Sequence, residues 1–288
     1  MTPPQGATLL ALTALTALAA LVLGGCGDNQ TVPDPHDPYG EGDAGPLSCV
    51  PNLDGKIEAA ELRAAYDIPV SYLVSPKGEK RPVDVAGKSD GMGGQIWDFS
   101  PDIASDQKAT LTAHEVVGSW YASSFPEGQF ASPIDAGGTI DGIYKADGQA
   151  ISLLGVASVT EMPKAGKTLL VYDTPIAIYR FPLVPGAKWV SKGSIKDGVV
   201  SGLPYAGTDT YEVEDDATGR LDLHDFTFTQ VHRIRTKVTL SPAVGASTFQ
   251  RQVGFVTECF GEVTRATSLN DEKADDFTMA SEVRRLGQ

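Results

Sequence analysis

The chain is poor in the residue types that perform nucleophilic or metal-dependent chemistry. It holds three cysteines and four histidines among 288 residues. His114, His224 and His232 fall in different strand-like segments, and no pair of them has the spacing of a zinc site. His36 stands alone in a stretch rich in proline and aspartate. The sequence therefore predicts no catalytic constellation, and we do not expect an enzyme.

Positive charge is also scarce. The chain has 23 Lys and Arg against 37 Asp and Glu, which gives a formal net charge of −14. A surface of this sign repels nucleic acid and anionic lipid headgroups, so neither is an expected partner. The 31 glycines and the 21% of charged residues are typical of a folded, turn-rich β protein.

An uncharged apolar run lies near the start. Residues 1–25 carry no charged side chain, and Leu9–Leu23 contains only Ala, Leu, Val and Thr. This length suits the core of a secretory signal peptide, of about 7–15 residues, and is short for a spanning helix, which needs about 20. The run ends at Leu23-Gly24-Gly25-Cys26, which resembles the lipobox of bacterial lipoproteins, although that family carries Lys or Arg before the run. The alternative is an ordinary signal peptide with a cysteine there by chance.

The lipobox resemblance implies a lipid anchor and a location. The signal peptide, residues 1–25, would be removed, and the thiol of Cys26 would carry a diacylglyceryl group, usually with an acyl chain on the new amino terminus. Two or three chains hold a protein firmly, because each buried CH₂ contributes about 0.8 kcal/mol. The expected location is the cell envelope, lipid-anchored to a membrane, the outer membrane in particular.

Residues 26–48 predict a tether. This stretch contains Pro33, Pro35, Pro38 and Pro46, with Asp and Gly between them, and almost nothing to bury. We expect a disordered, partly extended spacer.

Residues 50–61 resemble an EF-hand calcium loop. That loop takes oxygen ligands at its first, third, fifth, seventh and twelfth positions and glycine at the sixth. Asn52, Asp54, the Lys56 carbonyl and Glu61 fall at the third, fifth, seventh and twelfth positions, and glycine follows Asp54. Val50 stands at the first position, where Asp belongs. The resemblance implies calcium as a possible cofactor; otherwise no cofactor is expected.

The other interpretation of this stretch is structural. A turn at Asp54-Gly55 would start a short helix over Ile57–Tyr66, with Leu62 and Tyr66 on one face. A helix this short is marginal alone, so we expect it to dock on the main body. Because the first ligand is missing, we expect no calcium binding at physiological levels.

From residue 69 onward the patterns favour strands. Short apolar runs, such as Val70–Val74 and Ile140–Ala146, are separated by turn residues. Asp147-Gly148 and Asp197-Gly198 each separate two strand-like runs, and Asp-Gly in this setting predicts a tight hairpin. Ala217–Gly219 predicts a third turn.

The longest alternating segments are Phe228–Leu240 and Val253–Arg265. Period-two alternation places one face of a strand in a core and the other in water. The polar face of the first carries basic residues at 233, 235 and 237, and that of the second carries Glu258 and Glu262. We interpret these opposite charges as cross-strand pairs; an anion site on the basic face is the alternative.

Two smaller features belong to the same region. His232 alternates with Gln230 and Ile234, which favours a hydrogen-bonded histidine in the core over a metal ligand. The last segment, Asp276–Arg285, alternates weakly and predicts an edge strand or a short helix.

Cys49 and Cys259 form an even number once Cys26 is set aside for lipid. In an oxidising compartment a disulfide between them would close nearly the whole folded body. Two unpaired buried thiols are the alternative. The alternation places Cys259 in mid-strand on the apolar face, so Cys49 would have to reach it from an open end or flank of the sheet.

Phe181–Trp189 carries a further resemblance. A Phe-Pro turn followed by glycine, with Trp189 on the next strand, resembles uncharacterised envelope lipoproteins with a curved antiparallel sheet, and also lipoprotein-carrier-like half barrels. Neither group supplies catalytic residues. The plain alternative is a Pro-Gly hairpin with Trp189 in the core.

Together these features predict a mainly β (α+β) fold. We expect a large curved antiparallel sheet or incomplete β-barrel over residues 69–288, with one short N-terminal helix within residues 49–68. The expected function is non-enzymatic binding or scaffolding by a lipid-anchored envelope protein. Its partners would be the membrane, through the lipid on Cys26, and an envelope protein or a small apolar ligand.

Two other functions remain open. One is a carrier of a lipid or acyl chain in an apolar cavity of a half barrel, which a deep apolar cavity would favour. The other is a hydrolase with dispersed carboxylates, because any Asp and Glu can meet in a fold. Clustered, inward-facing carboxylates would favour the hydrolase.

Overall fold

The computed structural model describes residues 49–62, 64 and 66–287. Over these residues it consists of sixteen strands and two single-turn 3-10 helices, η1 (Ala59–Glu61) and η2 (Ala122–Ser124). The strands are β1 (Pro69–Val74), β2 (Arg81–Pro82), β3 (Lys88–Ser89), β4 (Gln95–Phe99), β5 (Gln107–Thr112), β6 (His114–Glu115), β7 (Phe130–Pro133), β8 (Ile140–Ala146), β9 (Ala150–Ser158), β10 (Leu169–Arg180), β11 (Lys188–Val200), β12 (Leu203–Leu223), β13 (Thr227–Pro242), β14 (Thr248–Thr257), β15 (Gly261–Ser268) and β16 (Met279–Leu286).

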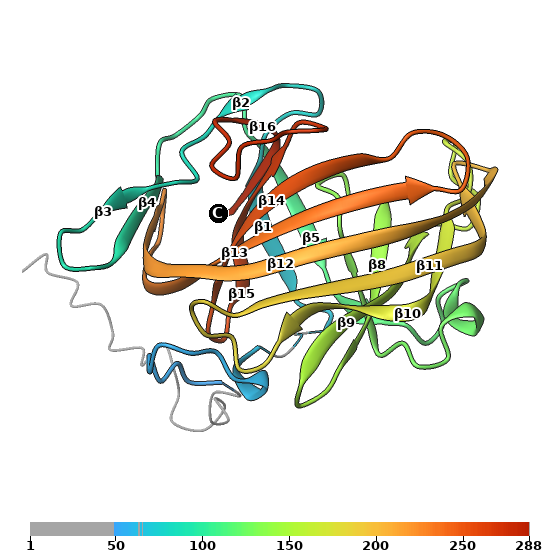
Figure 1. The fold of residues 1–288 in the computed structure, drawn as a ribbon, viewed down its shortest axis with the longest axis horizontal. Coiled ribbons are helices and arrows are strands. Elements are labelled where there is room, and N and C mark those ends of the chain that lie inside the picture. Colours follow the sequence, from blue (N-terminus) through green and yellow to red (C-terminus); the bar gives the residue numbers. More distant parts are fainter. Residues whose placement is uncertain (1–48, 63, 65, 288) are drawn as a thin grey trace, which may run out of the picture. The chain divides into compact units, whose positions relative to one another are not determined.

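The strands form one sheet that nearly closes into a barrel (Figure 1). Its order is β5-β1-β16-β15-β14-β13-β12-β11-β10-β9-β8-β7-β6, with antiparallel neighbours. The two ends of this path, β5 and β6, are separated in sequence by Ala113 alone. One stretch of chain therefore pairs with β1 at its start and with β7 at its end. The predicted curved antiparallel sheet or incomplete barrel is confirmed.

The longest strands, β11 to β13, run side by side along one side of the barrel (Figure 1). The hairpin predicted at Asp197-Gly198 is wrong, because this dipeptide lies inside β11 at a shift in its register with β12. The turn comes later, at Ser201 and Gly202, whose φ angles are 50° and 80°. Such left-handed values are what a two-residue hairpin turn requires.

The turn predicted at Ala217–Gly219 is also wrong, since β12 continues through it. The short strand β4 runs parallel to β12 here, with Gly219 opposite Gln95. A Cβ atom on Gly219 would lie 2.1 Å from the carbonyl oxygen of Gln95, so this glycine permits a close approach of two backbones and not a turn. Asp147-Gly148 does join β8 to β9 as predicted, with a bond of 3.0 Å from the Asp147 amide to the Ala150 carbonyl.

The alternating segment Val253–Arg265 is two strands joined by a tight turn, not one strand. β14 ends at Thr257, and β15 begins at Gly261. Cys259 lies in the turn between them with a φ of 66°, so its predicted place in mid-strand on the apolar face is wrong. At the tip of a hairpin it is within reach of Cys49. The two form the predicted disulfide, with Cα atoms 5.5 Å apart.

The helix predicted over Ile57–Tyr66 is wrong as well. In the described part of this segment the one helical element is η1, closed by a capping box between Glu58 and Glu61. Ile57 instead forms a β-bridge with Leu183, with reciprocal backbone bonds of 3.0 and 2.8 Å. A short helix gains little free energy by itself, so tertiary contacts of this kind decide the local conformation.

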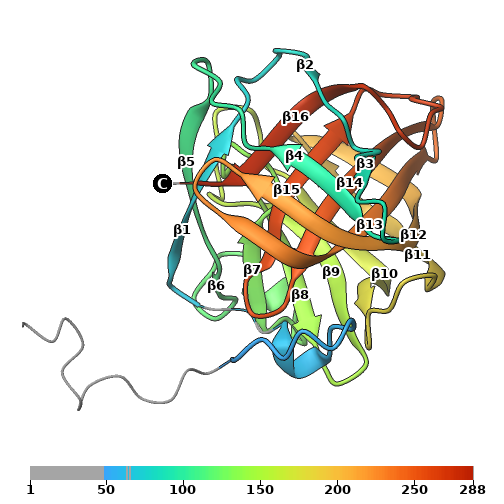
Figure 2. The ribbon, with the colours of Figure 1, turned by 90° about the vertical axis from the view of Figure 1, so that its left-hand side faces the viewer.

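An outer layer covers one face of the barrel (Figure 2). The excursion that carries β2, β3 and β4 packs on the outside of β13–β16. The rings of Trp97 and Phe99 lie 5.1 and 5.4 Å from that of Phe255 on β14. Val283 of β16 belongs to the same apolar cluster. In the sheet, β16 pairs with β1 on one side and with β15 on the other. The prediction of an edge strand or short helix for Asp276–Arg285 is therefore wrong.

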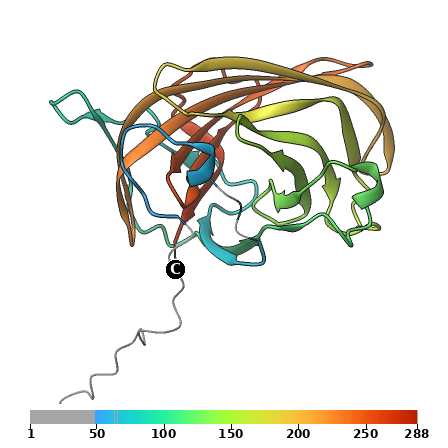
Figure 3. The ribbon, with the colours of Figure 1, turned by 90° about the horizontal axis from the view of Figure 1, so that it is seen from below.

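Residues 49–62, drawn in blue in Figure 3, are attached to the turn between β14 and β15. The backbone amides of Asn52 and Leu53 donate to the Glu258 carboxylate at 2.6 and 3.1 Å. The Cys259 amide donates to the Glu61 carbonyl at 2.7 Å. Ile57 and Leu62 bury their side chains in a cluster with Phe130, Ile151, Trp189, Val213, Ile234 and Val256. This segment therefore packs against the inner residues of both the early and the late strands.

Removing the disulfide should lower stability while the barrel still folds. The bond joins residues separated by 210 positions. Chain entropy then gives about 5 kcal/mol, an upper value because unfolded chains retain structure. We expect a Cys49→Ser/Cys259→Ser double variant to keep its β circular dichroism and to unfold at lower urea concentration. In a Cys26→Ser background, thiol titration of the unfolded protein should find no free thiol before reduction and two after it. Two thiols before reduction would contradict the bond.

Candidate functional site

Two adjoining cavities, of about 270 and 120 Å³, lie in the space inside the barrel, which we call the lumen. The larger one is lined from β1, β15 and β16 on one side and from β7 to β10 on the other. The cavity lies inside the barrel where the two ends of the sheet meet, because Leu111 of β5 and Ala113 between β5 and β6 also line it. The residues that line both cavities are Ile134, Tyr144, Ile178, Tyr179, Glu262 and Arg265.

The walls of the larger cavity are mainly apolar and aromatic, and those of the smaller one are polar and apolar in equal measure. In the larger cavity Phe130 and Tyr144 stack with ring centroids 5.2 Å apart. The smaller cavity adds Leu153, Tyr211 and Ile234. Apolar walls with a few placed polar groups are typical of small-molecule sites, whose volumes are about 300–1,000 Å³.

One charged cluster interrupts these walls. Glu262 accepts hydrogen bonds from Arg265, at 3.0 and 2.9 Å, and from Arg284, at 2.7 Å. Arg265 on β15 stands directly opposite Arg284 on β16. Like charges in this position repel each other, so the carboxylate between them offsets a repulsion that the strand register imposes.

The local backbone makes room for this cluster. The register of β14 and β15 shifts between Phe255 and Val256, directly after the turn that carries Cys259. Gly254 faces Arg265 across the two strands. A Cβ atom on Gly254 would lie 2.9 Å from a carboxylate oxygen of Glu262. The absence of a side chain at Gly254 therefore gives the carboxylate its space.

All three members of the cluster are charged at neutral pH. Burial alone would raise the pKa of Glu262, but the charges of Arg265 and Arg284 outweigh it and hold this pKa below its usual range. Burial likewise opposes the charge of Arg265, and the Glu262 carboxylate more than compensates, so the pKa of Arg265 is raised. The cluster therefore contributes one net positive charge to the lumen.

The segment before β1 contributes to the same cavity. Leu62, Ala64 and Ile68 line it together with Cys259 and Phe260 of the β14–β15 turn. The disulfide thus fixes two parts of the cavity wall to each other. Sequence reasoning did not find this site, because its charged residues come from segments that only the strand order brings together.

The calcium-like loop holds its own side chains. Asn52 donates to one oxygen of Glu61 at 2.6 Å, and the other oxygen accepts the Glu58 amide at 2.8 Å. The Lys56 ammonium lies 3.7 Å from Asp54 and 2.5 Å from Glu58. The described residues contain no group of three or more His, Cys, Asp or Glu side chains that could hold a metal ion. In this conformation internal donors occupy the carboxylate oxygens of Asp54, Glu58 and Glu61.

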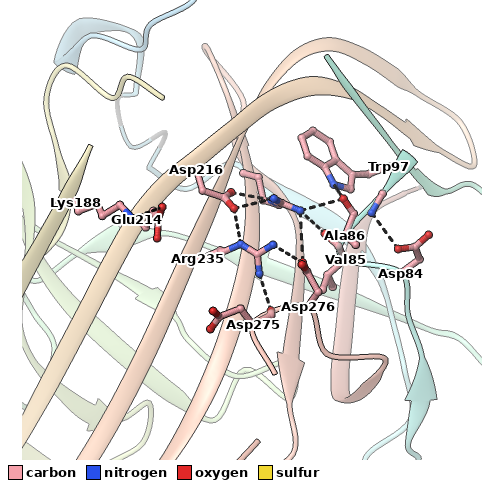
Figure 4. Close-up of polar contacts among 12 residues, drawn as sticks. Asp84, Val85, Ala86, Trp97, Lys188, Glu214, Asp216, Arg235, Asp275 and Asp276 are labelled. Carbon is pink, nitrogen blue, oxygen red and sulfur yellow. Dashed lines mark hydrogen bonds and ion pairs between the residues drawn. The ribbon is translucent and has the colours of Figure 1, made fainter. Parts of the chain in front are cut away.

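A second hollow, of about 460 Å³, lies over β11–β14 and is charged (Figure 4). Arg235 bridges Asp216 and Asp276, and Lys188 pairs with Glu214 at 2.7 Å. The other charged residues of this hollow are paired too, Lys237 with Glu212 and Arg251 with Asp275. The basic residues of β13 do form charge pairs as predicted, but the predicted partners are wrong. The carboxylates come from β12 and from residues 275–276, and not from Glu258 and Glu262.

The same network attaches the outer layer. Arg233 pairs with Asp216 at 2.7 Å and donates to the carbonyls of Val85 and Ala86 at 2.7 and 3.1 Å. Trp97 donates to the Ala86 carbonyl at 3.2 Å (Figure 4). Because its charges are already paired, this hollow offers a ligand no unmatched charge.

Two other buried carboxylates, Asp141 and Asp209, have separate partners. Asp141 accepts from Tyr121 at 2.7 Å, and His114 lies 3.1 Å from the same hydroxyl. Asp209 accepts from Tyr172 at 2.7 Å. Burial raises the pKa of each of these carboxyls. Asp141 lies on β8 and Asp209 on β12, each with a different tyrosine partner, so the two do not form the clustered pair that a glycoside hydrolase requires.

His232 is a hydrogen-bonded core histidine, as predicted. Its Nδ1 lies 2.8 Å from Asp215, and both side chains are buried. Sequence reasoning overlooked the segment Gly87-Lys88-Ser89-Asp90-Gly91, which matches the Gly-x-Ser-x-Gly motif of the serine-hydrolase nucleophile elbow. In the structure, Ser89 ends β3, with no helix after it among the described residues, and its hydroxyl accepts the Gly91 amide at 3.1 Å. Strand order places Ser89 three strands from His232, roughly 14 Å at about 4.8 Å per strand, which is too far for proton transfer.

Comparison of the chain with protein-family models, with curated proteins and with solved structures finds no significant match. Over the described residues, the structure contains no helix with the length and hydropathy needed to cross a bilayer. The predicted signal peptide, Cys26 and the tether lie outside the described residues. Their assignment rests on the sequence.

Removing the Glu262 carboxylate should be strongly destabilising. We expect Glu262→Gln to cost about 3–5 kcal/mol at pH 7, because two facing arginines lose their buried partner. Glu212→Gln is the matched control. It breaks a pair with Lys237 whose side chains are 48% and 33% exposed, so we expect a loss of at most about 1 kcal/mol.

The same variant should show a defined pH dependence. The folded pKa of Glu262 is lowered, so its contribution is fully present above the unfolded value of about 4.3 and is lost as pH falls through the folded value. The difference in unfolding free energy between wild type and Glu262→Gln should therefore shrink below about pH 4. Urea titrations across this range measure it, and a difference independent of pH would contradict the charged cluster.

Proposed function

We propose that the protein is a lipid-anchored protein of the cell envelope whose barrel binds a small apolar molecule in the lumen. The observation that carries this proposal is the pair of adjoining cavities inside the barrel, the larger of which has a mainly apolar and aromatic lining. Buried apolar surface drives association at about 25 cal/mol per Å². Of the functions considered, a carrier or binder is the one that an apolar cavity of this kind favours.

The remaining features agree with a binding role and not with hydrolysis. The buried carboxylates are dispersed, and Ser89 lies too far from His232 to be activated by it. The acidic charge of the chain, −14, keeps the body away from anionic headgroups, so attachment would come through the lipid on Cys26. The tether of residues 26–48 would then allow the barrel to move away from the membrane surface.

Filling the lumen should abolish binding of an apolar probe. Nile red, a neutral dye whose fluorescence rises in apolar surroundings, should bind the wild-type protein saturably. Ile178→Trp, at a position that lines both cavities, should weaken this binding at least about tenfold by occupying the site. Val190→Trp is the matched control, because Val190 on the neighbouring strand β11 is 54% exposed and lines only the outer hollow. Equal binding by both variants, or none by the wild type, would refute the proposal.

Loss of the cysteine should release the body from the membrane. In Cys26→Ser no thiol is present to accept a diacylglyceryl group, so we expect the protein to move from the detergent phase to the aqueous phase on phase separation. Gln30→Ser, a neutral change in the predicted tether, should partition as the wild type does. Unchanged partitioning of Cys26→Ser would rule out the lipid anchor.

A further inference from the structure

The charged side chains that line the two cavities do not balance. Arg265 and Arg284 carry two positive charges and Glu262 carries one negative charge. No other charged side chain of the described residues lines either cavity. A net charge inside a protein is costly unless it is paired, so this lumen favours a guest with one negative charge.

Arg284 also has hydrogen-bond donors to spare. It is 7% exposed, and its Nη2 donates to Glu262. Its Nε and Nη1 are buried and have no partner among the described residues. No other side chain lining the two cavities has such buried, unpartnered atoms. Buried donors without partners are rare in folded proteins, which indicates that a group absent from the chain completes this site.

The chemistry of the missing group follows from these donors. A guanidinium presents its N–H groups in a planar fork, which matches the two oxygens of a carboxylate. A carboxylate also carries a single charge at neutral pH. A phosphate monoester carries about −1.5 to −2 and would leave the lumen with excess negative charge. Charge and shape therefore both select a monocarboxylate.

The rest of the ligand follows from the walls. Arg284 lines the larger cavity, and Arg265 lines both. Ile178 and Tyr179 line both cavities. Phe130 lines the larger cavity and Leu153 the smaller one. A group held at the arginines can thus extend an apolar body along a continuous apolar wall.

We propose that the lumen binds a monocarboxylate with an apolar chain, the chemistry of a fatty acid, with its carboxylate at Arg284 and Arg265. This inference rests on the proposed function, that the lumen takes an apolar molecule, and adds the headgroup. Glu262 would hold the two arginines apart and in place. The chain would lie against Ile178 and Tyr179.

Displacement of Nile red from the full-length protein by three ligands of equal chain length tests the headgroup. These are dodecanoate, dodecanol and the methyl ester of dodecanoic acid, at neutral pH. We expect dodecanoate to bind about ten- to hundredfold more tightly than the other two, the effect of charge-assisted hydrogen bonds to a buried arginine. Equal displacement by all three would overturn the headgroup and leave the proposed function standing. Failure of Nile red to bind, or failure of all three ligands to displace it, would overturn both.

Variants then locate the preference. In Arg284→Gln the ratio of dodecanoate affinity to dodecanol affinity should fall toward one. Arg284→Lys keeps the positive charge but loses the planar guanidinium, so its ratio should be intermediate. Arg220→Gln, at an exposed arginine paired with Asp222, is the control and should keep the wild-type ratio. An unchanged ratio in Arg284→Gln would overturn the assignment of the carboxylate to Arg284. The wild-type ligand series decides the headgroup even where this variant does not fold.

Discussion

A sheet that nearly closes into a barrel encloses an interior that has to be filled. The rest of this structure depends on that constraint. Closure removes the unpaired strand edges that an open sheet exposes. Here it is achieved by one stretch of chain around Ala113, which pairs with β1 before that residue and with β7 after it. The interior that results has to be filled by side chains, sealed at its ends or occupied by a guest. The structure uses side chains and a disulfide-linked segment for part of the volume and leaves the rest as cavity.

The position of charge inside the barrel is the least expected result of that closure. A strand pair that places Arg265 opposite Arg284 would be unfavourable on an outer surface and more so in a lumen. Glu262 offsets one of the two positive charges by bonding to both arginines. What remains is a single charge and a pair of idle donors, which no part of the described chain satisfies. The outer hollow over β11–β14 contrasts with it, because there each charged side chain has a partner of opposite sign.

Period-two alternation was enough to predict the fold class, since half-buried strands leave that pattern whatever their order. The alternation and turn signals gave wrong predictions where the same residues can form either a turn or an irregularity inside a strand. Asp197-Gly198 and Ala217–Gly219 have turn composition, but long strands that curve around a barrel use the same residues for bulges and close backbone approaches. Val253–Arg265 alternates without interruption because both arms of the hairpin face the same core. That continuity concealed the turn at Cys259 and made the disulfide seem harder to form than it is.

The lumen site could not have been predicted in the same way. Glu262 was assigned to an outer face, because its neighbours alternate, whereas the register shift between Phe255 and Val256 turns it inward. Arg284 stood in a segment with weak alternation and gave no indication of its burial. Their meeting depends on β16 pairing between β1 and β15, a long-range choice that local sequence does not encode. The disulfide partners, by contrast, followed from counting cysteines.

The place of the disulfide at Cys49 has a mechanical consequence. Cys49 is where the predicted tether meets the described chain, and its sulfur is bonded to the turn between β14 and β15. In a protein held by Cys26, a pull along the tether therefore divides at this residue. The covalent route through Cys259 into the barrel is far shorter than the route through residues 50–68 to β1. Tension would pass into the β14–β15 hairpin, and the segment carrying Ile57 and Leu62 would stay slack, so that Leu62 keeps its place in the cavity wall while the anchor is under strain.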